Sequence, residues 1–71
     1  MQYLVVIEKG DGTFGAYVPD LPGCIATAES EEAVRSLIKE AIAFHIEGLR
    51  ENGESVPAPS SSGEVVEVGA A

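Results

Sequence analysis

The sequence contains one cysteine, one histidine, no tryptophan, and only four basic residues against twelve acidic ones. A single cysteine excludes an internal disulfide, and no run approaches the about 18 to 20 apolar residues of a membrane span or the pattern of a signal peptide. We therefore expect a cytoplasmic protein with no membrane partner. The net charge of −8 is the reverse of the basic surface that binds phosphate backbones, which argues against a stand-alone nucleic-acid binder.

The length of 71 residues predicts a single domain that spans residues 1–71. A core of this size rarely contributes more than about 3–5 kcal/mol to stability. The sequence offers neither a disulfide framework nor a cluster of metal ligands to add to it. Self-association is therefore the expected additional source of stability.

Apolar segments separated by turn-forming residues predict four strands. The stretch from Lys9 to Gly12 predicts a tight turn between the first two, and the proline- and serine-rich stretch after Val56 predicts a connector. Val66 and Val68 share one face of the last, alternating segment. The expected strands cover residues 2–8, 13–18, 24–28 and 64–68, with approximate ends.

A long amphipathic helix is predicted over residues 31–52, with Ser30 as its N-cap and Gly53 as its terminator. Such a helix is about 33 Å long, whereas a six-residue strand spans about 20 Å, so the helix extends beyond its sheet. We expect the projecting apolar stripe to form a homodimer or a higher oligomer. The residues assigned to this interface are Ile42, Phe44, His45, Ile46 and Leu49.

The residue types that carry catalysis are few and isolated. His45 has no cysteine, aspartate or second histidine at ligand spacing, so a semi-buried residue of the core or interface is favoured over a general base or metal ligand. Cys24 is interpreted as a small apolar residue, and both aspartates as turn residues. Gly10, Gly12 and Gly15 match a phosphate-binding pattern in letters only, because a strand follows them rather than a helix. We assign no catalytic residue, no metal ligand and no cofactor.

The loop Pro19–Cys24 is rigid, since its two prolines fix φ and remove two hydrogen-bond donors. One interpretation is a surface that contacts a protein partner, together with the acidic start of the helix. The other, equally weighted, is a turn that joins two strands. The candidate partner-binding residues are Pro19, Asp20, Leu21, Pro22, Gly23, Cys24, Glu31 and Glu32.

Three strings, FGAYVPDLPGC at residues 14–24, SEEA at 30–33 and VPAPS at 56–60, closely resemble the N-terminal domain of the HicB family of antitoxins. Their order and spacing match over nearly the whole chain. The resemblance implies a small α+β domain of two layers in the order β-β-β-α-β, with one long amphipathic helix on a mixed or antiparallel sheet. This arrangement is described as a partial ribonuclease H fold without that enzyme's catalytic carboxylates, so no enzymatic activity is expected.

The resemblance also implies a partner. HicB proteins neutralise HicA, a small basic toxin that cleaves mRNA, by covering its active face, and the negative field of this chain would attract such a protein. Typical members carry a C-terminal DNA-binding domain for which these residues hold no candidate segment, so direct DNA binding is not expected. The leading hypothesis is an antitoxin that binds a HicA-type toxin. The alternative is an orphan dimeric regulatory or structural module with no toxin partner.

Overall fold

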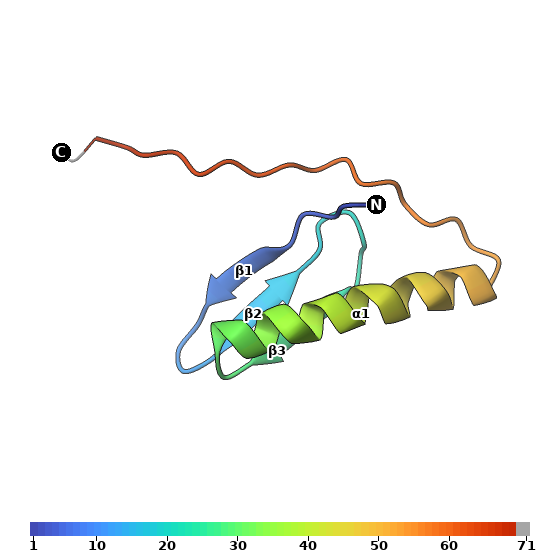
Figure 1. The fold of residues 1–71 in the computed structure, drawn as a ribbon, viewed down its shortest axis with the longest axis horizontal. Coiled ribbons are helices and arrows are strands. Elements are labelled where there is room, and N and C mark those ends of the chain that lie inside the picture. The colour runs from blue at the N-terminus through green and yellow to red at the C-terminus, as the bar shows by residue number, and fades with distance from the viewer. Residues whose placement is uncertain (70–71) are drawn as a thin grey trace.

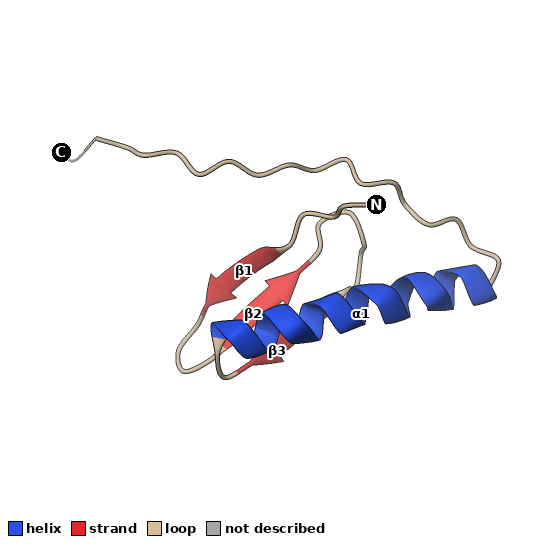
Figure 2. Cartoon of the chain, in the orientation of Figure 1, coloured by secondary structure: helices blue, strands red, loops and turns tan. Residues whose placement is uncertain are grey.

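The computed structural model describes residues 1–69 as three short strands followed by one long helix. The strands β1 (Val6–Lys9), β2 (Phe14–Tyr17) and β3 (Ile25–Ala28) form an antiparallel sheet in the order β1-β2-β3. The helix α1 (Glu31–Glu51) lies across one face of this sheet, as Figures 1 and 2 show. The predicted α+β class, with one long helix on a small sheet, is confirmed.

The first two strands form the predicted hairpin. Lys9 pairs with Phe14 in register, and the backbone N–H of Gly10 donates a hydrogen bond of 2.7 Å to the carbonyl of Thr13. Gly12 has a φ of 77°, a left-handed conformation that glycine adopts without steric cost. Local turn chemistry therefore fixes this hairpin.

Both ends of α1 are defined by capping interactions. The hydroxyl oxygen of Ser30 accepts a hydrogen bond of 3.1 Å from the N–H of Ala33, as an N-cap does. At the other end Gly53 has a φ of 70°, and the N–H of Glu54 donates to the carbonyl of Leu49 at 2.8 Å, which is the pattern of a Schellman motif. The helix predicted at residues 31–52 thus ends one residue earlier.

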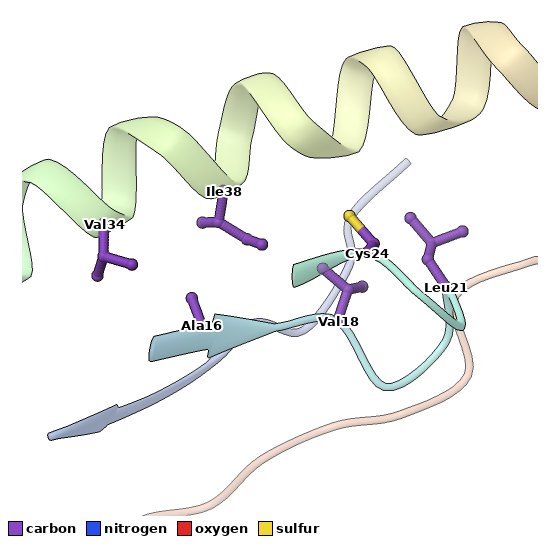
Figure 3. Packing of buried hydrophobic residues seen from close by; sticks show 6 residues of the cluster. All are labelled: Ala16, Val18, Leu21, Cys24, Val34 and Ile38. Atoms are coloured by element: carbon purple, nitrogen blue, oxygen red, sulfur yellow. The ribbon is translucent and has the colours of Figure 1, made fainter. Parts of the chain in front are cut away.

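The core lies between α1 and the end of the sheet at which the loop from β2 to β3 begins. In Figure 3, Val34 and Ile38 point from the helix toward Ala16 on β2, and Leu21 and Cys24 close the space farther along the helix. Each of these side chains is almost or fully removed from solvent. The buried residues are Ala16, Val18, Leu21, Cys24, Val34 and Ile38.

The helix extends well beyond the sheet, as expected. Its 21 residues span about 31 Å, whereas strands of four residues span about 13 Å. Figure 1 shows the C-terminal half of α1 projecting past the strands. Only the first half of the helix therefore has sheet beneath it.

The expected fourth strand at residues 64–68 is wrong for the single chain. After the helix, the chain turns back past the N-terminus and continues as an extended segment that pairs with no strand of the described residues (Figure 1). The pattern is compatible with a strand, but residues 64–68 do not pair with the edge of β1. The first strand also begins later than predicted, because β2 ends at Tyr17, the partner of Val6, and leaves the preceding residues unpaired.

Candidate protein-interaction surfaces

The loop between β2 and β3 is largely part of the core. The N–H of Val18 donates to the carbonyl of Cys24 at 3.2 Å, and the N–H of Cys24 donates to the carbonyl of Leu21 at 3.0 Å, so the loop folds back on itself. Leu21 is 0% exposed and Cys24 is 3% exposed. These two candidate partner-binding residues lie beneath α1 in this structure and are not on the surface.

Burial also settles the chemical character of Cys24. Desolvation raises the pKa of its thiol, because the charged thiolate is disfavoured away from water. A protonated, enclosed thiol is a poor nucleophile and a poor metal ligand. The structure thus supports the interpretation of Cys24 as a small apolar residue.

Asp20 holds the segment that follows the helix, an interaction that we call the clasp. Its carboxylate accepts hydrogen bonds from the backbone N–H groups of Ser60 and Ser61, both 2.8 Å long, and from their hydroxyls at 3.1 and 2.8 Å. The bond from the N–H of Ser61, followed by that from Ser60, lowers the pKa of Asp20 to about 2. Asp20 therefore acts as a fixed anionic anchor for residues 60–61.

The sequence predicted Asp20 as a turn residue, but it did not predict hydrogen bonds from a residue 40 positions away. Tyr3 adds a second tether, since its hydroxyl donates to the carbonyl of Pro57. The only sequence signal for these contacts was the family string VPAPS, which includes Pro57 and Ser60. The spacing of this string does not indicate which residues of the chain it contacts.

The remaining candidate partner-binding residues form two separate exposed groups. Pro19, Pro22 and Gly23 lie at the outer surface of the loop, where β3 begins. Glu31 and Glu32 lie at the start of α1, directly after β3 ends. The structure places the two groups at opposite ends of β3 and does not bring them together into one site.

The residues assigned to the helix interface divide between the chain's own core and its surface. Ile42 and Ile46 are partly buried against the core cluster. Phe44 points outward and is 78% exposed, whereas His45 and Leu49 are partly exposed near it. Phe44 is therefore the residue of this set with the most apolar surface left to bury.

Phe44 also borders a groove between α1 and the edge strand β3, which we call the Phe44 groove. The groove has a volume of about 570 Å³ and is open to solvent. Ile25 and Leu37, 68% and 42% exposed, give it an apolar lining. Exposed apolar surface of this kind is typical of a protein contact. Its full lining is Ile25, Ala26, Thr27, Leu37, Glu40, Ala41 and Phe44.

Among residues 1–69, no three histidine, cysteine, aspartate or glutamate side chains gather closely enough to hold a metal ion. Within the same range, α1 lacks the length of apolar sequence that crossing a bilayer requires. His45, the one histidine, lies beside Phe44 and Leu49 along a shallow groove, without an acidic cluster. The surfaces described so far are suited to contacts with other proteins.

Comparison with known proteins identifies the family. The family model described as a HicB-like antitoxin of bacterial toxin-antitoxin systems matches residues 3–69. The chain belongs to this HicB-like antitoxin family. A UPF0150 protein of Thermoplasma acidophilum is 40% identical over 58 residues, covering 80% of this chain and 84% of the relative. A UPF0150 protein of Archaeoglobus fulgidus is 39% identical over 59 residues, covering 79% of this chain and 86% of that relative.

A longer relative also matches. An uncharacterised 14.9 kDa protein from the rep-hol intergenic region of Haemophilus phage HP1 is 40% identical over 57 residues, which cover 80% of this chain but 43% of the phage protein. The chain thus matches less than half of the length of the phage protein, and most of the length of the two UPF0150 relatives.

Proposed function

We propose that this HicB-like protein binds and neutralises a small basic, mRNA-cleaving protein of the HicA type through direct protein–protein contact. Membership of the HicB-like antitoxin family over residues 3–69 is the observation that carries the proposal. Exposed acidic and apolar surfaces are both available to a partner, and the net charge is −8. A basic partner would be drawn to this field, which raises its association rate more than its final affinity.

The acidic end of the molecule is the surface that we assign to the basic partner. Phe14 pairs with Ala28, so the hairpin turn before β2 and the turn after β3 lie at the same end of the sheet. Asp11, Glu29 and Glu32 are exposed there. Glu31 shares this end but forms an ion pair of 2.8 Å with Arg35, and both side chains are more than half exposed.

Inhibition of mRNA cleavage tests the antitoxin role. The purified chain is titrated into a HicA-type toxin and a defined mRNA, and cleavage is expected to stop near an equimolar ratio. Undiminished cleavage at excess protein would contradict this role and favour an orphan module. To locate the surface, Glu31→Gln and Glu32→Gln are combined and compared with a matched Glu47→Gln and Glu51→Gln pair on the distal half of α1. We expect slower association for the first pair only.

We further propose that the chain forms a homodimer through the projecting half of α1, with Phe44 at the centre of the contact. Its exposed ring and the adjoining Phe44 groove support this assignment. Phe44→Asp is the informative variant, because Ile46 packs against the chain's own core and its substitution would also destabilise the monomer. Ser36→Asp, exposed on the same helix, is the control.

Sedimentation velocity of these variants tests the dimer. The parent and Ser36→Asp are expected to sediment as assemblies of the 7.4 kDa chain, and Phe44→Asp is expected to sediment at a lower mass with unchanged helical circular dichroism. A parent chain that stays monomeric at high micromolar concentration would contradict the proposal.

A further inference from the structure

Residues 64–68, which we call the arm, leave the body of the molecule with their apolar side chains in solvent. Val65 is 101% exposed, Val66 64% and Val68 82%. The radius of gyration is 14.1 Å, whereas a compact chain of this length has a value of about 11 Å. Figure 1 shows the segment after α1 running extended, outside the layers of sheet and helix. The arm exposes apolar surface and backbone groups that a strand partner would cover.

The edge of β1 has the complementary features. Within the described residues β1 pairs only with β2, so the backbone N–H and C=O groups along its outer edge have no strand partner. The helix packs mainly over β2 and β3, and a hollow of about 320 Å³ remains between β1 and α1. We call this the β1 hollow; it is lined by Val5, Ile7, Arg35, Ile38 and Lys39.

The side chains of the arm match this hollow in polarity and charge. In an extended chain Glu64, Val66 and Val68 share one face. The two valines suit the apolar part of the hollow, formed by valine and isoleucine side chains, and the glutamate suits its basic part. Arg35 and Lys39 are two of the four basic residues in the chain. A strand of this sequence beside β1 would bring opposite charges together and bury the exposed valines.

We propose that the arm of one copy adds to β1 of a second copy as a fourth strand, with Val66 and Val68 in the partner's β1 hollow. The beginning of the segment is tied to its own chain by the clasp and by the bond from Tyr3 to Pro57. Gly63 still lies close to the body, since a Cβ added there would lie 3.1 Å from a methyl carbon of Leu4.

Beyond Gly63 the arm departs from the body although its own β1 begins close by (Figure 1). In the single chain, therefore, neither the arm nor the outer edge of β1 has a strand partner within the described residues. In a dimer, the arm of each copy would pair with the β1 edge of the other copy. This is a reciprocal exchange of strands. This contact lies at β1, across the sheet from the Phe44 groove at β3, and it does not depend on binding a toxin.

Adjacent substitutions in the arm test which face is covered. Val66→Asp places a charge on the face assigned to the hollow, and Val65→Asp makes the same change on the opposite face. Both sites are exposed in the single chain, so neither variant should unfold it. In sedimentation velocity we expect Val66→Asp to reduce the mass of the assembly about twofold and Val65→Asp to leave it unchanged. Equal behaviour of the two variants would overturn the proposal.

Thiol crosslinking distinguishes exchange between chains from closure within one chain. In a Cys24→Ala background, an untagged chain with Val66→Cys is mixed with a tagged chain with Lys39→Cys and treated with a short bifunctional thiol reagent. We expect a product with the summed mass of the two chains. A single chain carrying both cysteines is treated in parallel. If that chain crosslinks only internally, or if no product forms in either reaction, the exchange is refuted.

Discussion

Truncation of Leu21 is the sharpest test of how the loop Pro19–Cys24 functions in this fold. Its side chain is 0% exposed and lies beneath α1 beside Cys24 (Figure 3). Replacing a buried leucine with alanine costs about 2–5 kcal/mol, because the transfer free energy is lost and a cavity remains. The core of a domain this small contributes about 3–5 kcal/mol in total. Leu21→Ala should therefore remove half or more of the free energy of unfolding.

Urea unfolding followed by the far-ultraviolet circular dichroism of α1 measures this loss. With a slope of about 1 kcal/mol per molar urea, the midpoint should fall by about 2 M or more. Leu37→Ala is the matched control, because Leu37 is 42% exposed and its loss leaves no enclosed cavity; it should cost about 1 kcal/mol. If Leu21→Ala shifts the midpoint no more than Leu37→Ala does, the loop is not part of the core and its assignment as a partner surface regains support.

Three further predictions concern the ends of α1 and the clasp. Ser30→Ala removes the N-cap acceptor and should lower the free energy of unfolding by about 1 kcal/mol in the same urea assay. Gly53→Ala should cost about 1–2 kcal/mol, because its φ of 70° strains any residue with a Cβ even though no atom lies within 4 Å of one. Asp20 has a pKa lowered from 3.8 to about 2, so the clasp stabilises the folded chain above pH 4 and is lost as the pH falls toward 2. Protection of the Ser60 and Ser61 amides from hydrogen exchange should fall over this pH range. In Asp20→Asn this pH-dependent change in protection should be absent.

The helix and hairpin could be predicted from the sequence because short-range chemistry determines them. Ser30 accepts from an N–H three residues away, and Gly53 supplies the left-handed conformation that the end of α1 requires. Gly12 does the same in the turn between β1 and β2. In each case the residue type and its immediate neighbours contain the whole signal, so the predicted ends of these elements were close to those observed.

The error at residues 64–68 arose because a strand depends on an edge as well as on a pattern. Val66 and Val68 share one face of an extended segment, but this pattern does not reveal whether an unpaired edge lies within reach. In the single chain Asp20 holds Ser60 and Ser61, and residues 64–68 do not pair with β1. The clasp joins positions 40 residues apart, which one sequence cannot disclose.

Part of the loop Pro19–Cys24 is buried and part is exposed, and individual side chains explain this difference. Leu21 is the apolar residue between two prolines, and it turns inward because the loop bonds Val18 to Cys24 and closes over the core. Pro22 stays outside. The sequence left open whether this loop is a partner surface or a turn that joins two strands, and the structure adds that the loop directs one large side chain under α1.

The distribution of charge separates the two proposed contacts. Arg35 and Lys39 line the β1 hollow, which would repel a basic protein and favours the acidic arm. Glu29 and Glu32 are exposed at the end of the sheet where α1 begins, and that end would favour a basic protein and repel the arm. The same net charge of −8 can therefore serve both associations, because two of the four basic residues line the hollow where the chain would meet its own copy. A second copy bound through its arm would leave the acidic end open to a toxin.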